Sequence, residues 1–277
     1  MMNHPQNIAA EVLAELRRNR PLILCLTNNV VQDITANMLL ATGGVPVMLT
    51  HSDEIHDLLH SCANGMLVNV GTLSEAQAQT MLHAVKEAAR ARIPWVLDPV
   101  AIGLLQYRTR VCGELLQTPP GMIRGNASEI IALAGAEGAL CRGVESGADS
   151  KAAISAAQAL ARTTGAAVLV TGETDYATDG HTIIACYNGH EIMTRVTGVG
   201  CAMGALAAAC LSIAPTPLKA AIATAAILGI AGERAAARAP RPGSFAAALL
   251  DELDALTPDD IIRHARLDFI QHRKQEI

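Results

Sequence analysis

Residues 66–99 read MLVNVGTLSEAQAQTMLHAVKEAARARIPWVLDP, and this stretch decides the fold. The apolar run 66–68 is followed by polar residues, then by an Ala-rich helical segment over 74–92. A second apolar run, 95–97, ends at Asp98. Continuous apolar runs are typical of strands that are covered on both faces of a sheet. The stretch therefore predicts a strand, a helix and a second strand parallel to the first.

The same alternation of apolar runs and helical segments extends along most of the chain. Two further segments are amphipathic or helical in pattern, residues 8–19 and 53–62. The other short apolar runs, each followed by small or polar residues, are 22–26, 45–49, 122–123 and 167–170. We therefore expect an α/β fold with a mainly parallel central sheet and helices on both faces. Ligands of such sheets bind at the carboxyl ends of the strands, which is where the polar residues stand.

The closing third of the chain departs from this alternation. Residues 175–196 predict antiparallel hairpins, because short apolar runs are separated by tight-turn residues. After them we expect only helices, over 201–212, 218–238, 244–255 and 258–271. A Gly/Ala-rich loop is expected over 135–149, and residues 1–277 are expected to form a single domain.

The composition excludes several classes of protein. Of 277 residues, 51% are hydrophobic and 17% charged, which argues against intrinsic disorder. The net charge of −5 argues against a nucleic-acid-binding protein, which usually carries a basic face. Only 2% of the residues are aromatic, so a stacked aromatic cage for a ligand is not expected.

The apolar composition raises the question of a membrane span. The longest charge-free stretch, 196–218, is long enough to cross a bilayer, but its glycines and prolines predict a loop, a buried helix and a turn. The first residues show no signal-peptide pattern. The seven cysteines form no CxxC pair, so we expect a cytoplasmic protein without a disulfide framework.

The segment Thr197-Gly198-Val199-Gly200-Cys201 is the strongest local signal for ligand binding. It follows an expected strand and opens an Ala-rich helix. Glycines allow the backbone close to a ligand, and a helix N-terminus favours an anion, so a phosphate cradle is indicated. The segment is neither a dinucleotide fingerprint nor a Walker loop. The alternative is that the glycines only permit tight packing of the helix on the sheet.

Two carboxylates follow neighbouring strands of the predicted sheet. Asp98 ends one apolar run, and Glu129 stands in Asn126-Ala-Ser-Glu129 after another. Carboxylate oxygens can hold Mg²⁺, often through water, and beside a phosphate cradle this predicts phosphoryl transfer. The alternatives are a turn residue before Pro99 for Asp98 and an exposed first-turn residue for Glu129. Arg124 could clamp phosphates or pair with a surface carboxylate.

Histidine and cysteine side chains offer two further candidates. His56 and His60 are four residues apart on one helix face, a spacing that can bind a metal. No third ligand is evident in the sequence, and a solvated helix face is the favoured interpretation. Cys201 begins a helix, where a thiol has a lowered pKa, so nucleophile, general base and small packing residue all stay open.

Taken together, these motifs resemble those of the hydroxyethylthiazole kinase family, which has a ribokinase-like fold. The match covers most of the chain, from about Leu22 to Pro242-Gly243-Ser244-Phe245. Six motifs carry it in order: Thr27-Asn-Asn-Val-Val31, Asn69-Val-Gly-Thr72, Leu97-Asp-Pro-Val100, Arg124-Gly-Asn-Ala-Ser-Glu129, Val170-Thr-Gly-Glu173 and Gly198-Val-Gly-Cys201.

The resemblance implies a phosphotransferase of thiamine salvage. Its reaction would be ATP-dependent phosphorylation of the hydroxyl of 4-methyl-5-(2-hydroxyethyl)thiazole. Arg124 and Thr171 would contact ATP. Asp98 and Glu129 would organise Mg²⁺ through water, with Asn126 in support.

The resemblance also implies the residues of the substrate side. Met48, Asn28 and Val30 would line the thiazole pocket, and Gly198 would lie against the substrate. The backbone from Gly198 through Gly200 to Cys201 would form the anion hole. In the wider ribokinase-like group an Asp general base occupies the position of Cys201. Because a thiol is a poorer-matched base, we expect the anion hole and Mg²⁺ to supply most of the rate, with Cys201 secondary.

In this family the pocket is completed across a subunit contact, and the implied assembly is a homotrimer. Two other functions fit the same fold. One is an ADP-dependent hydrate dehydratase, against which Cys201 and Thr27-Asn-Asn-Val-Val31 argue. The other is a nucleotide-binding relative without activity, against which the retention of Asp98 and Glu129 argues.

Overall fold

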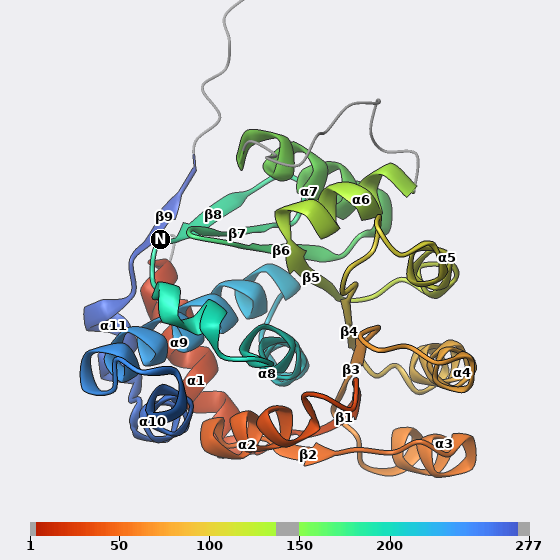
Figure 1. Cartoon of the computed structure of the whole chain (residues 1–277), viewed down its shortest axis with the longest axis horizontal. Helices are drawn as coiled ribbons and strands as arrows, with labels where there is room; N and C mark the ends of the chain where they lie inside the picture. The colour runs from red at the N-terminus through yellow and green to blue at the C-terminus, as the bar shows by residue number, and fades with distance from the viewer. Residues whose placement is uncertain (1–3, 137–149, 271–277) are drawn as a thin grey trace, which may run out of the picture.

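The computed structural model describes residues 4–136 and 150–270, and its strands form one nine-stranded sheet (Figure 1). The strands are β1 Leu22–Leu26, β2 Val45–Val47, β3 Gly65–Asn69, β4 Trp95–Asp98, β5 Met122–Asn126, β6 Ala167–Thr171, β7 Asp175–Thr178, β8 Ile183–Cys186 and β9 Leu267–Phe269. The helices are α1 Pro5–Asn19, α2 Gln32–Thr42, α3 Ser52–Ser61, α4 Glu75–Ala91, α5 Gln106–Leu115, α6 Ala127–Ala136, α7 Ser150–Thr164, η1 Glu191–Arg195 (a 3₁₀-helix), α8 Val199–Ile213, α9 Pro217–Arg238, α10 Pro242–Ala255 and α11 Pro258–His264.

The βαβ unit predicted from residues 66–99 is present as β3, α4 and β4. The two strands are parallel and in register, with Asn69 opposite Asp98. A capping box starts α4, because the side chains of Ser74 and Gln77 each bond to the other residue's backbone N–H. Arg92 ends the helix in the left-handed conformation, which turns the chain back toward the sheet.

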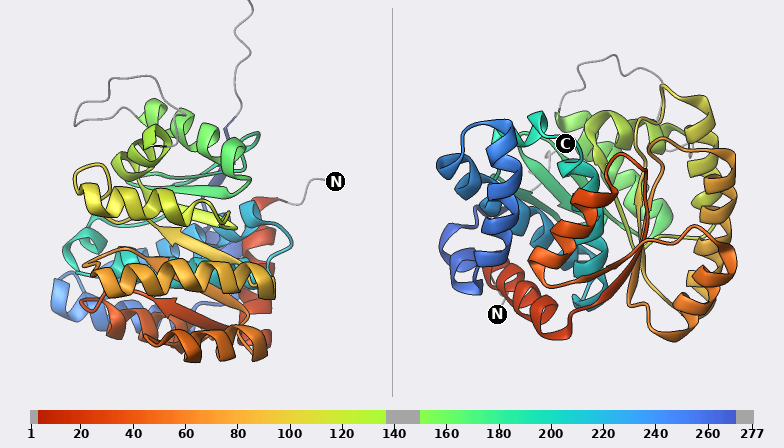
Figure 2. Two further views of the ribbon diagram at one scale, coloured as in Figure 1. Left: turned by 90° about the vertical axis from the view of Figure 1, so that its right-hand side faces the viewer. Right: turned by 60° about the horizontal axis from the view of Figure 1, so that its bottom comes forward.

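The strand order is β2-β1-β3-β4-β5-β6-β7-β8-β9, and the first six strands are parallel. The hairpin predicted within 175–196 supplies β7 and β8, which run antiparallel. Helices cover both faces of the sheet: α1, α2, α8, α9 and α10 on one, α3 to α7 on the other (Figures 1 and 2). The mainly parallel sheet between two helical layers is confirmed.

The scarcity of aromatic residues is explained by the packing of α8 and α9. Both helices are buried along almost their whole length and consist largely of alanine. Alanine side chains allow two helices and a sheet to approach closely, and they lose no side-chain entropy on burial. At Gly204 an added Cβ would lie 2.8 Å from Leu67 Cδ1, so α8 there touches β3 directly.

Two of the predicted elements are wrong. The strand expected at the end of 175–196 is instead the 3₁₀-helix η1, which His190 caps by accepting a hydrogen bond from the Ile192 N–H. The helix expected over 258–271 ends at His264, and β9 follows, antiparallel to β8. The hydrogen-bond partners of β9 come from a strand about eighty residues earlier, so local sequence does not reveal them.

Two other expectations concern loops and membranes. Most of the loop expected over 135–149, and residue 271, lie outside the described residues. The stretch 196–218 does not form a membrane-length helix, because α8 ends at Ile213 and α9 begins at Pro217. In the described ranges, α9 is long and apolar enough to cross a bilayer, but 83% of its apolar window is buried inside the protein.

Candidate active site

Polar side chains from four neighbouring parallel strands meet at one edge of the sheet. Asn69 ends β3 and Asp98 ends β4, and the two residues are paired in register. Asn126 and Thr171 likewise end β5 and β6 as a pair. The expectation that the polar strand ends gather at the carboxyl edge is therefore confirmed.

Asp98 is fully buried at this edge. Its Oδ2 accepts a hydrogen bond of 2.6 Å from Asn69 Nδ2, and its Oδ1 lies 3.5 Å from Arg124 Nη1. Burial raises the pKa of Asp98 from 3.8 to about 6, although Arg124 opposes the rise. Burial thus disfavours the charged form of Asp98, which a second cation would stabilise. Its contacts go beyond those of a turn residue before Pro99.

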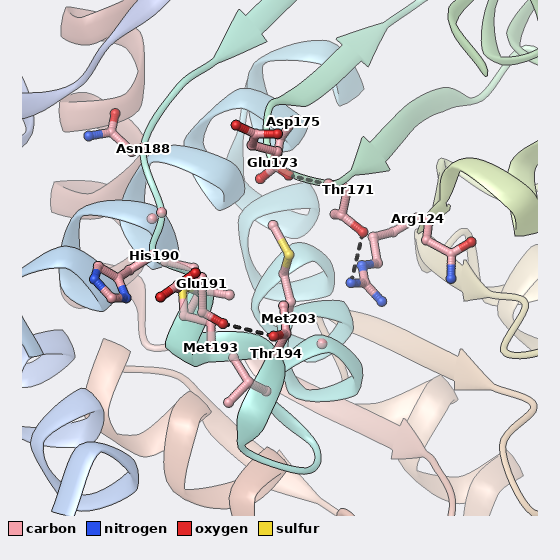
Figure 3. A pocket seen from close by; sticks show the side chains of 17 residues that line it. Arg124, Thr171, Glu173, Asp175, Asn188, His190, Glu191, Met193, Thr194 and Met203 are labelled. Atoms are coloured by element: carbon pink, nitrogen blue, oxygen red, sulfur yellow. Dashed lines mark hydrogen bonds between the residues drawn. The ribbon is translucent and has the colours of Figure 1, made fainter. Parts of the chain in front are cut away.

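Arg124 projects from β5 toward both Asp98 and the neighbouring strand. Its Nη2 donates to Thr171 Oγ1 over 3.0 Å, and the Thr171 hydroxyl lies 3.3 Å from the Gly125 carbonyl oxygen (Figure 3). Arg124 Nε is buried and has no hydrogen-bond partner among the described residues. A guanidinium that is held by Asp98 at Nη1 and by Thr171 at Nη2 is a positioned cation, suited to an anionic ligand.

Glu129 is buried in the first turn of α6, so the exposed position considered for it is wrong. Its Oε2 accepts from the Asn126 N–H and its Oε1 from the Ala101 N–H, each over 2.9 Å. Asn126 Oδ1 in turn accepts from the Glu129 N–H, so the two residues fix each other. Its charge also contributes to the raised pKa of Asp98, which shows that the two carboxylates act on one another.

The glycine segment places the N-terminus of α8 beside Arg124. Gly198 has a φ of +93°, and a Cβ there would lie 2.7 Å from Ile34 Cγ2. A Cβ on Gly200 would lie 3.2 Å from Arg124 Nη2. Gly198 is therefore required by its positive φ and by close packing, a Cβ at Gly200 would be tight against the Arg124 guanidinium, and no side chain caps the helix. This geometry leaves the first N–H groups of α8 for an anion, so packing and ligand binding are not alternatives here.

Cys201 stands in the first turn of α8, but its pKa is raised and not lowered as expected. Burial is the larger cause, and the charge of Asp98 adds to it. Asn69, the charge of Arg124 and Asn28, whose Nδ2 lies 3.9 Å from the sulfur, only partly oppose this rise of the pKa. The thiol is therefore neutral near pH 7, which removes the basis for a reactive thiolate.

A pocket of about 890 Å³ opens beside these groups (Figure 3). Arg124, Thr171 and Gly200 line it, as does Asn126, whereas Asp98 and Glu129 are not among its lining residues. Its other lining residues come from the β6–β7 turn, from 188–194 and from α8 and α9: Gly172, Glu173, Asp175, Asn188, Gly189, His190, Glu191, Met193, Thr194, Val199, Met203, Leu228 and Gly229.

None of the four residues expected on the substrate side lines this pocket: Gly198 lies just before the lining residues Val199 and Gly200, and the other three are Asn28, Val30 and Met48. Asn28 is buried and its Nδ2 donates 3.0 Å to Asn69 Oδ1, which joins it to the Asp98 cluster. Val30 is 64% exposed, and Met48 packs against the core that α2 and α8 share. The structure thus brings Asn28 and Cys201 together, while Val30 and Met48 stay apart from the pocket.

Sequence reasoning gave no role to two polar residues of the site. Asn69 bridges Asn28 and Asp98, and its only signal was its place at a strand end inside a quoted motif. Asp175 lines the pocket and accepts from the Gly172 N–H, and burial raises its pKa to about 6. Nothing in the local pattern of a predicted hairpin distinguishes Asp175.

Known proteins are similar in sequence to this chain over nearly its whole length. A hydroxyethylthiazole kinase of Akkermansia muciniphila is 56% identical over 254 residues, which is 92% of this chain and 93% of that protein. One from Escherichia coli is 48% identical over 252 residues, 91% of this chain and 95% of that protein.

Solved structures agree with the sequence comparison. The structure of a hydroxyethylthiazole kinase protein from Pyrococcus horikoshii OT3 superposes with a TM-score of 0.88 at 36% identity, covering 95% of this chain and 99% of that one. A Staphylococcus aureus pyridoxal kinase in complex with ADP gives a TM-score of 0.60 at 15% identity, covering 77% and 88%, a likeness of fold alone. The ribokinase-like fold is confirmed.

The model of the Hydroxyethylthiazole kinase family matches residues 13–259. That match spans every strand and loop that builds the site, from β1 to the N-terminus of α8 and beyond. With relatives of about half-identical sequence over nine-tenths of its length, this chain belongs to the hydroxyethylthiazole kinase family.

Proposed function

We propose that this chain transfers the γ-phosphoryl group of ATP to the hydroxyl of 4-methyl-5-(2-hydroxyethyl)thiazole at the carboxyl edge of its sheet. The family and its relatives make the chain a hydroxyethylthiazole kinase, a phosphotransferase of thiamine salvage. The observation that carries the site assignment is the meeting of Arg124, Asp98 and the uncapped N-terminus of α8 beside one pocket.

The triphosphate of ATP lies along Arg124 and the start of α8 in this proposal. Asp98 and Thr171 hold the two terminal nitrogens of Arg124, so the guanidinium is positioned before the nucleotide binds. The N–H groups near Gly198 and Gly200 then face the charge that develops on the transferred phosphoryl group. The remaining volume of the pocket, beside Met203, accommodates the base and ribose.

A divalent cation fits the acidic pair beside the pocket. Asp98 and Glu129 are both buried, the pKa of Asp98 is raised, and Arg124 is the cation in contact with Asp98. Two buried carboxylates of this kind suit a hard cation with oxygen ligands, and we propose that they hold Mg²⁺ through water, with Asn126 fixing Glu129. When bound, Mg²⁺ neutralises charge on the phosphate oxygens.

The hydroxyl of the substrate approaches from the side of Asn28 and Cys201. A neutral thiol is a poor proton acceptor, so Cys201 positions the substrate and contributes little of the rate. Val30 and Met48 would contact the thiazole ring, and the exposure of Val30 agrees with a pocket that a second subunit completes. We therefore propose a homotrimer, which light scattering of the purified protein tests directly.

The location and organisation of the chain are also proposals. The cysteines that the structure describes are free, which is compatible with the reducing cytoplasm. The described helices pack on one sheet, so we propose that the catalytic domain is the whole chain, 1–277. Limited proteolysis tests this, because a second domain would yield a stable fragment.

A coupled assay of ADP release tests the activity. We expect ATP consumption that requires both the thiazole alcohol and Mg²⁺, and a phosphorylated thiazole as product. ATP consumption without the thiazole, ADP-dependent dehydration of a hydrate, or nucleotide binding without turnover would each reject the kinase assignment. Arg124→Ala, in a site residue, should abolish turnover, whereas Arg110→Ala, on the surface of α5, should not.

A further inference from the structure

Two histidines and a buried glutamate converge on the face of the sheet opposite α8. Helices α3 and α4 are neighbours on that face (Figure 1). His56 and His60 lie on one face of α3, and Glu87 reaches them from α4. Glu87 Oε2 lies 3.0 Å from His56 Nδ1 and 3.0 Å from His60 Nε2. The third ligand that the sequence does not reveal is thus supplied by the packing of α4 on α3.

The buried position of Glu87 distinguishes this cluster from an ordinary surface pair. The side chain of Glu87 is 3% exposed, whereas those of His56 and His60 are 53% and 37% exposed. In the described ranges the other buried carboxylates are Asp98 and Glu129, which belong to the active site. A buried carboxylate needs compensation, and here two imidazole nitrogens converge on one oxygen of it.

The spacing of the three donor atoms suits a transition-metal ion. All three lie within 4.8 Å of one another. An ion with bonds of about 2.0 Å to the Glu87 oxygen and to a histidine nitrogen 3.0 Å from that oxygen would hold the two at an angle of about 97°, somewhat below the roughly 109° of a regular tetrahedral site. The exposed sides of the histidines leave room for water as a further ligand.

The rest of the Glu87 carboxylate is held in place by a cation. The Arg90 guanidinium, one turn along α4, pairs with Oε1 and leaves Oε2 to the histidines. Support of this kind orients a ligating carboxylate. Two imidazoles and one carboxylate favour Zn²⁺ and similar ions over Mg²⁺, which prefers oxygen ligands, so this cluster differs in chemistry from the acidic pair of the active site.

We propose that His56, His60 and Glu87 form a binding site for a divalent transition-metal ion of the Zn²⁺ type, which links α3 to α4. The site uses no residue of the catalytic pocket, so it stands or falls independently of the kinase assignment. Bound metal would stabilise the folded chain, because the three ligands come together only when α3 packs on α4.

Titration calorimetry with ZnCl₂ tests the site, using protein without a polyhistidine tag, freed of metal by EDTA and kept in excess Mg²⁺ to occupy the acidic pair. We expect one Zn²⁺ per chain and a rise in melting temperature. Co²⁺ should give visible absorption bands when it replaces Zn²⁺. His56→Ala and His60→Ala should each lower the affinity by about 100-fold or more, since even supporting residues contribute about 10–100-fold.

Two control variants keep the test specific. His181→Ala removes another exposed histidine, in the β7–β8 turn, and Cys62→Ser removes the exposed thiol just beyond α3. Both should bind Zn²⁺ like the unchanged protein. His56→Ala and His60→Ala change exposed side chains, so these two variants should fold and keep thiazole-dependent turnover. Absence of binding, unchanged binding in His56→Ala, or loss of binding in either control would overturn the proposal.

Discussion

Asp98→Asn separates the contribution of the buried carboxylate to stability from its contribution to activity. Burial raises the pKa of Asp98 from 3.8 to about 6. A difference of roughly 2 units corresponds to about 3 kcal/mol of free energy, at about 1.4 kcal/mol per unit. Because Asp98 is fully buried, solvent screening does not reduce this figure.

The sign follows from the order of the two pKa values. The unfolded chain releases the Asp98 proton near pH 4 and the folded protein releases it near pH 6, so the folded state binds more protons between these values. Ionisation of the buried Asp98 carboxyl therefore lowers the free energy of unfolding of the unchanged protein, with no effect below about pH 4 and the full effect above about pH 6. Asn does not ionise, so Asp98→Asn lacks this cost.

Urea unfolding in EDTA, from pH about 4.5 to about 7.5, measures the effect. We expect the free energy of unfolding of Asp98→Asn, relative to the unchanged protein, to rise by about 2 kcal/mol across that range, since part of the total effect lies below pH about 4.5. Asp175 titrates in both proteins and cancels from the difference. At the same time, thiazole-dependent turnover should fall by about 100-fold or more if the variant loses the cation ligand that we propose.

Asp268→Asn is the matched control, because it removes one negative charge at an exposed position on β9. Its stability relative to the unchanged protein should vary little with pH. A difference for Asp98→Asn that is equally flat would refute the reasoning, since the carboxyl would then titrate alike in the folded and unfolded chains. Full activity of Asp98→Asn would remove Asp98 from the proposed cation site.

Three further predictions concern the rest of the site. Gly198→Val places a side chain at φ +93°, so we expect the variant to lose about 2 kcal/mol of stability and most of its turnover. Gly113→Ala is the control, because an added Cβ there meets no atom within 4 Å, and this variant should be neutral or stabilised by up to about 1 kcal/mol. Cys201→Asp should keep or raise kcat, because the neutral thiol contributes little; complete inactivity would contradict this. Thr171→Val removes the acceptor of Arg124, so the KM for ATP should increase about 5-fold, for about 1 kcal/mol, and an unchanged KM would count against the role of Thr171 in orienting Arg124.

Much of the fold could be predicted because the relevant signals are local. A short apolar run that is followed by a polar residue or a helix, such as 66–68 or 95–97, predicts a buried strand from neighbouring residues alone. The strand β9 could not be predicted, because Leu267–Phe269 is extended only where the edge of β8 provides its hydrogen bonds. The 3₁₀-helix η1 was mistaken for a strand for the converse reason, since its cap at His190 satisfies the backbone locally.

For the candidate site, too, the sequence predicted which residues take part, whereas their electrostatic environment depends on the fold. The polar strand ends identified Asp98, Arg124 and Thr171 in advance, because parallel strands all end at one edge. The pKa of Cys201 was expected with the wrong sign, because the helix terminus is visible in sequence and the nearby charge of Asp98 is not. For Asp98 itself, the direction of the shift depends on burial that the fold creates.

The sequence by itself determined the α/β class, the edge of the sheet that carries the candidate site, and the family. Those properties depend on periodicity and on the order of short motifs, which neighbouring residues define. Only the tertiary structure decided which side chains act on each other: Asn69 on Asp98, Arg124 on the start of α8, and Glu87 between His56 and His60. Contacts of this kind join residues about thirty or more positions apart, so their energies arise only after the chain has folded.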